Sequence, residues 1–179
     1  MWYPAVVTDE ADVEPVTLPE AKKQVHAEYH TDDDAYLTSL ISASRDHAER
    51  YTGTRIAEQI VTLKCDGFDD FCTVPEAPLQ SVTVSYVDTA GATQTLADTV
   101  YELRADGLES AIVLKYGQTW PAIQSGSRIS VVAVAGYEAV PSALKHALLL
   151  FISDAFEQRE PAASGVRSTF DDLLSNFRR

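Results

Sequence analysis

The spacing of apolar residues changes twice along this chain of 179 residues, and no other feature constrains the fold as strongly. From Leu37 to Gly53 apolar residues recur every three or four positions, which is the spacing of a helix face. From Val61 to Ala135 apolar and polar residues largely alternate, as they do in strands. Helical spacing returns after Pro141. Helices followed by strands and a further helix are typical of an α+β fold.

Helix boundaries are marked by local signals. Thr17 and Glu20 have the spacing of a capping box, which favours a helix start. Gly53 is a typical helix stop, and Pro141 is suited to the first turn of a helix. The three predicted helices span residues 18–29, 33–52 and 142–158.

The third predicted helix is apolar at almost every position between Ala143 and Phe156. Such a stripe is too wide for a helix with one face in water. We therefore expect a long apolar helix that either forms the centre of the core or meets a second subunit. The residues assigned to this core or subunit interface are Leu144, Leu148, Phe151, Ile152 and Phe156.

A β lobe over residues 56–136 is expected between the second and third helices. Its last strand, 129–135, is apolar on both faces, which predicts a central strand covered on both sides. The fold class is thus an α+β helical bundle of two N-terminal helices and a long apolar C-terminal helix, with an inserted antiparallel β lobe and an extended C-terminal tail.

The sequence predicts that the chain is divided into three segments. Residues 1–16 are acidic with little periodicity, and we expect an arm that orders only on contact with another molecule. Residues 17–160 form the main domain. Residues 161–179 form a tail in which the small residues 162–165 precede a short amphipathic element.

Acidic residues dominate the charge of the chain. There are 27 Asp and Glu against 14 Lys and Arg, a net charge of −13. This balance argues against a protein that grips nucleic-acid phosphates over a broad basic surface. No window resembles an export signal or a membrane span, so we expect a soluble, cytosolic protein without a membrane partner.

The residues do not support a catalytic, cofactor or metal site. His26 and His30 are four apart, but the zinc-protease pattern needs Glu directly after the first His, and Ala27 stands there. No phosphate loop or nucleophile elbow is present. Cys65 and Cys72 are the only cysteines, and their aspartate neighbours are expected to raise a thiol pKa.

The residues favour an assembly protein instead. The C-terminal tail carries an apolar stripe at helical spacing followed by two arginines, which suits docking onto another protein. The alternative is an ordinary monomer whose last helix folds back on its own core. The residues concerned are Phe170, Leu173, Leu174, Phe177, Arg178 and Arg179.

The order of several short motifs resembles the head-tail connector (adaptor) proteins of long-tailed bacteriophages and gene transfer agents. The motifs lie at 16–22, 32–37, 48–53, 78–82, 120–121, 135–137, 140–141, 157–160 and 173–178. They read VTLPEAK, DDDAYL, AERYTG, PLQSV, WP, AGY, VP, EQRE and LLSNFR. The acidic first fifteen residues depart from the family's leaner N-termini.

The resemblance implies a virion protein of the neck, assembled in the bacterial cytoplasm. Its partners would be further copies of itself in a twelve-fold ring, the portal protein above, and a tail-side connector or stopper protein below. Double-stranded DNA would pass through the lumen without sequence-specific binding. The tail residues named above would bind the portal, and no enzymatic activity is implied.

Two other classes of function stay open at this stage. The chain could be a monomeric cytosolic binding module that uses its C-terminal amphipathic tail. Alternatively it could be a metal-dependent hydrolase that uses His26, His30 and Asp32 or Asp34.

Overall fold

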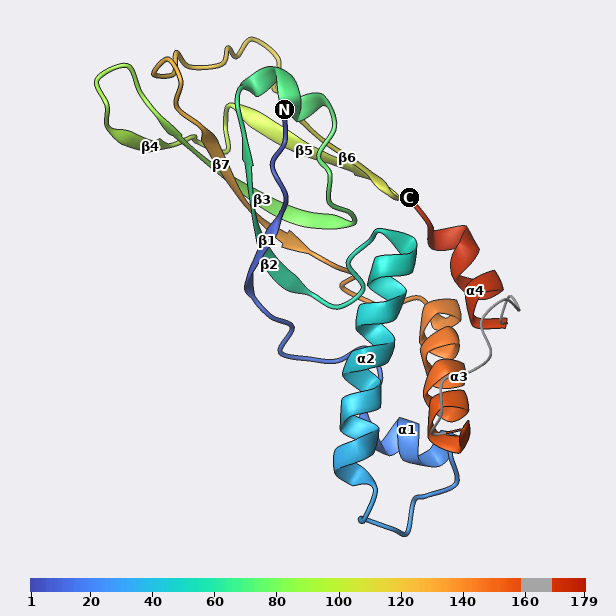
Figure 1. Ribbon diagram of the computed structural model, residues 1–179. Helices are drawn as coiled ribbons and strands as arrows, with labels where there is room; N and C mark the ends of the chain where they lie inside the picture. The colour runs from blue at the N-terminus through green and yellow to red at the C-terminus, as the bar shows by residue number, and fades with distance from the viewer. Residues whose placement is uncertain (159–168) are drawn as a thin grey trace. The chain divides into compact units, whose positions relative to one another are not determined.

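A computed structural model describes residues 1–158 and 169–179, which form two compact units (Figure 1). The β unit comprises Met1–Asp12 and Glu58–Glu138. The helical unit comprises Val13–Ala57 and Ala139–Arg179. Each unit therefore combines two separate stretches of the chain.

The β unit is built on a five-stranded antiparallel sheet in the order β1-β2-β7-β3-β4. A separate hairpin of β5 and β6 and a short 3-10 helix, η1, complete the unit. The element bounds are β1 Val6–Asp9, β2 Gln59–Cys65, η1 Phe68–Cys72, β3 Leu79–Val87, β4 Thr93–Thr95, β5 Tyr101–Asp106, β6 Glu109–Leu114 and β7 Ile129–Ala135.

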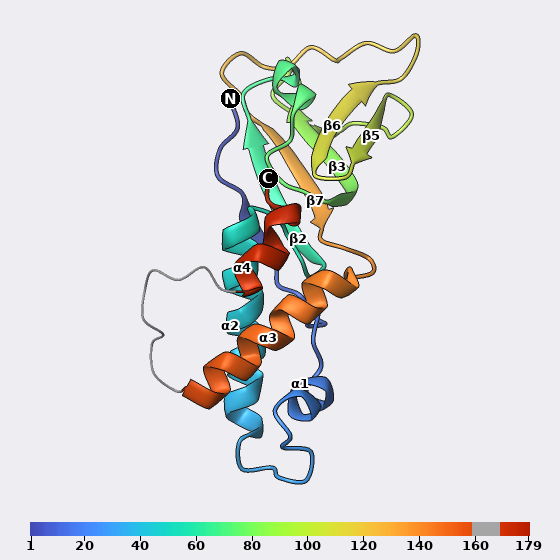
Figure 2. The ribbon, with the colours of Figure 1, turned by 90° about the vertical axis from the view of Figure 1, so that its right-hand side faces the viewer.

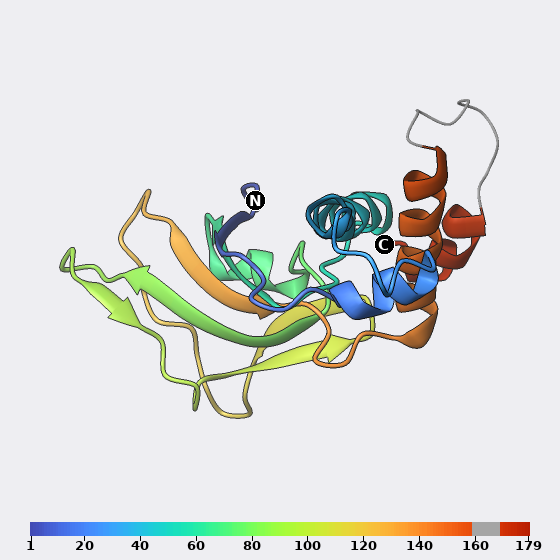
Figure 3. The ribbon, with the colours of Figure 1, turned by 90° about the horizontal axis from the view of Figure 1, so that it is seen from below.

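The core of the β unit lies on one face of this sheet. Val61 and Val131 are fully buried there, and Tyr101 and Ile112 of the hairpin join the same cluster. Figure 3 shows the hairpin on one side of the curved sheet. The alternation of the strand sequences thus places every second residue in one apolar core.

The central position predicted for the strand 129–135 is confirmed, but its expected burial on both sides is wrong. β7 pairs with β2 and β3, and its odd-numbered residues are buried. On the other face Val132 is 40% exposed. Apolar residues on both faces therefore do not mean that both faces are covered within one chain.

The expectation of an N-terminal arm that orders only on contact is also wrong. Residues Val6 and Val7 pair with Thr62 and Val61 of β2. Trp2 stacks on Phe71 with ring centroids 5.9 Å apart. Pairing with a strand more than fifty residues away orders this segment, and local sequence gives no sign of such a partner.

Four α-helices and a 3-10 turn make up the described part of the helical unit. Figure 2 shows α4 beside α3, and α3 also contacts α1 and α2. The bounds are α1 Leu18–Gln24, α2 Asp34–Thr52, α3 Ser142–Gln158, α4 Thr169–Leu174 and η2 Ser175–Phe177. Residues 159–168, which include all of the small residues 162–165 of the predicted tail, lie outside the described residues.

Two of the helix predictions need correction. α1 ends at Gln24, well before residue 29, because the chain turns and His26 adopts a φ of 57°. The long apolar helix expected over 142–158 is not supported, since α3 is amphipathic and buries only Leu144, Ala147, Leu148 and Ile152. By contrast, Gly53 ends α2 as predicted, in the left-handed conformation with φ 69°.

None of the described helices is both long enough and apolar enough to cross a membrane.

Candidate assembly surface

The C-terminal segment, Thr169–Arg179, packs on its own unit. Phe170 and Leu174 are buried, although the docking hypothesis expects them to be partly exposed in the free protein. Leu173 and Phe177 are half-buried, and Arg178 and Arg179 are exposed. The predicted stripe is therefore divided: two of its residues hold the segment in place and the others remain accessible.

The end of this segment lies at the C-terminal end of α2. The backbone N–H of Arg179 donates to the carbonyl oxygen of Thr52 at 2.8 Å. The Arg178 guanidinium lies 5.7 Å from the centre of the Tyr51 ring. The last carbonyls of a helix lack partners within the helix and carry partial negative charge, so positive groups are favourable here.

An aromatic cluster joins α4 to α2 and α3. His47 packs against both Phe151 and Phe170, with 5.3 Å between ring centroids in each pair. The two phenylalanines are also 5.3 Å apart. His47 of α2 thus packs its ring against residues of both α3 and α4.

The residues assigned to the core or a subunit interface divide by depth. Leu144, Leu148 and Ile152 are fully buried. Phe151 and Phe156 are half-buried, and Phe156 lies 6.0 Å from the Tyr36 ring. The first group forms the core of the helical unit, whereas the two phenylalanines line its surface.

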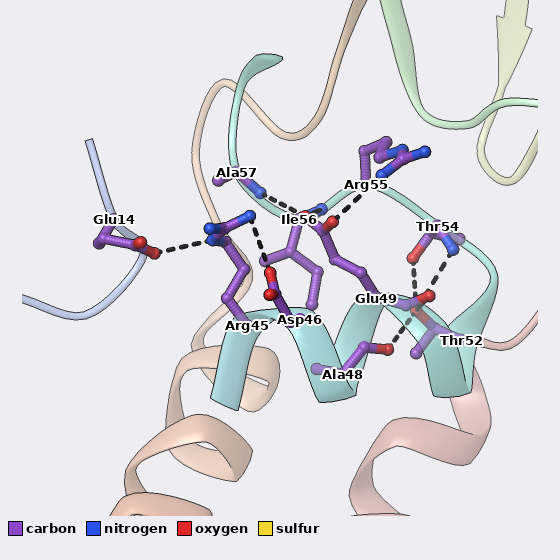
Figure 4. A network of polar contacts seen from close by, with 10 residues as sticks. All are labelled: Glu14, Arg45, Asp46, Ala48, Glu49, Thr52, Thr54, Arg55, Ile56 and Ala57. Carbon is purple, nitrogen blue, oxygen red and sulfur yellow. Dashed lines mark hydrogen bonds and ion pairs between the residues drawn. The ribbon is translucent and has the colours of Figure 1, made fainter. Parts of the chain in front are cut away.

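A polar network follows the end of α2 (Figure 4). The buried carboxylate of Glu49 accepts hydrogen bonds from the backbone N–H of Ile56 at 2.9 Å and of Ala57 at 3.4 Å. It also forms an ion pair with Arg55 at 3.5 Å. Glu49 therefore fixes the turn by which the chain leaves α2.

A second ion pair links Arg45 of the same helix to Glu14, which precedes α1. Glu14 accepts a hydrogen bond from Arg45 Nε at 2.9 Å, and Arg45 also contacts Asp46 at 3.2 Å. Burial of the guanidinium is the largest single influence and acts to lower the pKa of Arg45. The hydrogen bond to Glu14 and the negative charges of Glu14, Glu49 and Asp46 together outweigh it, so the pKa lies above its ordinary value. These contacts tie the segment before α1 to α2.

Sequence reasoning missed the role of Glu49. A glutamate near the end of a helix usually faces solvent, and no local pattern distinguishes this one. Its partners, Ile56 and Ala57, lie beyond the helix stop at Gly53. Their proximity depends on how the chain turns there.

The histidines considered for a metal site do not form one. Both His26 and His30 are exposed and lie beyond the end of α1, so they do not share a helix face. Asp34 instead pairs with Lys22 at 2.7 Å. Within residues 1–158 and 169–179, no three His, Cys, Asp or Glu side chains are grouped to hold a metal ion.

The two cysteines are free thiols in different surroundings. Burial, with smaller contributions from Asp70 and Asp66, raises the pKa of Cys65 to about 11. The aspartates thus act in the predicted direction, but burial is the larger cause. A thiol with so high a pKa is a poor nucleophile at neutral pH.

The fold has counterparts among solved structures of gene transfer agent (GTA) particles. A chain in the neck of an empty GTA particle, computed with C6 symmetry, matches with 20% identity and a TM-score of 0.79 over 98% of this chain and 95% of that one. A chain in the virion of a native GTA particle matches with 21% identity and a TM-score of 0.79, covering 97% and 94%.

A chain in the neck of a native GTA particle, computed with C12 symmetry, matches with 22% identity and a TM-score of 0.74, covering 97% and 94%. The sequence matches no protein-family model and no curated protein. At these identities the shared property is the fold, and it extends through both units.

Proposed function

We propose that this chain is a head-tail connector, a structural neck protein of a gene transfer agent or a related tailed phage. One observation carries the proposal. At least 97% of the chain is covered in each of the matches to GTA neck and virion chains, with TM-scores from 0.74 to 0.79. A likeness of this extent includes the helical unit, the inserted strands and the C-terminal segment together.

The proposed assembly is a ring of twelve copies below the portal and above a tail-side connector or stopper. The C6 and C12 symmetries of the similar neck structures support a ring of this kind. The net charge of −13 per subunit also supports a DNA conduit, because a lumen with the same charge sign as phosphate lets DNA slide without long-lived contacts.

Within this ring we propose that the C-terminal segment contacts the portal. Leu173, Phe177, Arg178 and Arg179 are accessible in the free chain and supply apolar area and positive charge. Phe170 and Leu174 are buried against the helical unit. They therefore hold the segment in position, and joining a portal contact would require α4 to detach.

The experiment that tests the function removes the gene from a strain that produces the particles. We expect DNA-filled heads and separate tails to accumulate, and purified protein added to the lysate to restore joined particles. Intact, infectious or DNA-transferring particles in the absence of the protein would contradict the proposal. The double variant Phe177→Ala with Arg178→Glu, which leaves the buried Phe170 and Leu174 in place, then tests the portal contact separately.

A further inference from the structure

One face of the sheet in the β unit is left open. Cross-strand pairing places Val6, Thr62, Val132 and Thr83 in one row on the side opposite the core. We call this side of β1, β2, β7 and β3 the open sheet face. Val6 is 60% exposed and Val132 is 40% exposed, so apolar area from two strands is accessible to solvent.

The same alternation adds further apolar side chains to the open sheet face. On the same face, two residues from Thr62 and Val132 along their strands, Ile60 pairs with Val134, and both side chains are half-buried. Together with Val6 and Val132 they form a patch of branched apolar residues among Ser and Thr hydroxyls. Contiguous apolar area of this kind on a sheet is typical of a protein contact.

The open sheet face also holds positive charge in a strongly acidic unit. The β unit contains 14 Asp and Glu but only four Lys and Arg. Arg104 pairs with Glu102 at 2.8 Å, and Lys115 donates to a backbone carbonyl oxygen. The other two cations, Lys64 and Arg128, line one hollow of about 300 Å³ with Ser85 and Ser130.

These two cations are available to an anionic partner. Neither Lys64 nor Arg128 forms an ion pair with a carboxylate in the described part of the chain. The Arg128 guanidinium lies 4.0 Å from the centre of the Tyr3 ring, which positions it. A guanidinium stacked on a ring keeps its N–H donors in its own plane, where they can bind a carboxylate.

We propose that the open sheet face binds a second copy of this chain through the outer side of that copy's β5–β6 hairpin. Hairpin register places Asp106 and Glu109 on this outer side, beside the Arg104–Glu102 ion pair, because Tyr101 and Ile112 point into the core. The carboxylates of one copy thereby meet Lys64 and Arg128 of the next. This inference rests on the proposed ring.

The geometry of the β unit suits a closed ring. The hairpin covers the core face of the sheet, so its outer side and the open sheet face lie on opposite sides of the unit (Figure 3). A ring requires such a heterologous interface, in which one surface meets a different surface of the next copy. DNA is the less suitable occupant, because the apolar patch gives nothing to phosphate and the unit as a whole repels it.

The test reverses the charges on each side of the contact. Lys64→Glu with Arg128→Glu is expected to reduce the fraction of protein in rings by about tenfold, because like charges then face each other. Lys23→Glu makes the same change of charge at an exposed lysine of α1, in the helical unit, and should leave assembly unchanged. Adding Asp106→Lys and Glu109→Lys to the double variant should restore the rings.

Native mass spectrometry in solution and electron microscopy of portal-bearing heads measure the rings, and thermal melting checks the fold. If the reversed variant misfolds, Lys64→Gln with Arg128→Gln replaces it and should weaken assembly to a smaller degree. Three results would overturn this inference without affecting the proposed function. They are normal rings in these variants, no rescue by the hairpin lysines, and a loss of DNA binding while the rings stay intact. Wild-type protein that forms no ring in either setting would overturn the proposed function as well.

Discussion

At the scale of single residues, the side chains that matter most are those that connect separate segments within one unit. Glu49 illustrates this, because its buried carboxylate accepts two backbone N–H groups beyond the end of α2. Glu20 is a second case. Its carboxylate accepts from the Thr17 backbone N–H at 3.0 Å and pairs with Lys145 of α3 at 2.6 Å.

Replacing Glu49 with Ala should lower the free energy of unfolding by about 2 kcal/mol, because two backbone N–H groups lose this acceptor in a buried place. Glu49→Gln keeps an acceptor oxygen and should cost less. Asp46→Ala on the same helix is the control, since Asp46 is 53% exposed. Chemical denaturation provides the measurement, and equal midpoints for Glu49→Ala and Asp46→Ala would contradict the assigned role.

Glu20 predicts a pH dependence of stability. The bond from Lys145, followed by that from the Thr17 backbone, lowers the pKa of Glu20 from 4.5 to about 2. A lowered pKa stabilises the folded state above pH 4.5, and this stabilisation is lost as the pH falls from 4.5 toward 2. Both partners are partly exposed, so we expect less than about 1 kcal/mol.

Melting temperatures of wild type and Glu20→Gln should therefore differ at pH 7 and converge as the pH approaches 2. Added salt should reduce the difference at pH 7, because it screens an exposed pair. A difference that stays constant across this pH range would show that the carboxylate charge has no part in it.

At the scale of elements, sequence patterns identify segments well where the cause of structure is local. The bounds of β7 coincide with the predicted strand 129–135, and α2 begins and ends within one residue of its prediction. β1 was missed because its pairing with β2 is long-range. α1 was extended too far, since the polar residues after Gln24 are compatible with either a helix or a turn.

Placement of the candidate site shows the same limit. Helical spacing identified the apolar stripe of the C-terminal segment, but not which of its residues contact the chain's own helices. Phe170 is buried because His47 and Phe151, from two other helices, meet it. Such contacts depend on tertiary packing, which periodicity does not encode.

The packing of α3 gives a prediction with an internal control. Leu148 is fully buried and Leu150, two positions on, is half-buried. Leu148→Ala should cost roughly 2–5 kcal/mol because it removes packed methyl groups and leaves a cavity. Leu150→Ala should cost clearly less. Equal losses of unfolding free energy would mean that the burial assigned to the two faces is wrong.

The C-terminal segment gives a prediction that separates stability from docking. Phe170→Ala should lower the free energy of unfolding by about 3 kcal/mol, because the ring is buried among aromatic partners. Phe177→Ala with Arg178→Glu should have a smaller effect on stability but should reduce binding to portal-bearing heads. Co-sedimentation with heads and thermal melting report the two properties, and undiminished binding by the second variant would exclude this surface.

At the scale of the whole molecule, the two units differ in the surfaces that they offer to other molecules. The β unit is strongly acidic and leaves one sheet face open, whereas the helical unit holds the C-terminal segment. Both arrangements are understandable in a subunit that has neighbours. The account therefore depends on the place in a symmetric neck that is proposed for this chain.

Electron cryomicroscopy of DNA-filled, tail-less heads incubated with the purified protein tests this place most directly. We predict a ring of twelve copies directly below the portal, each fitted by both units, and no such density on heads incubated without the protein. Heads that acquire no density at the portal, or that bind the protein elsewhere as single copies, would contradict the account.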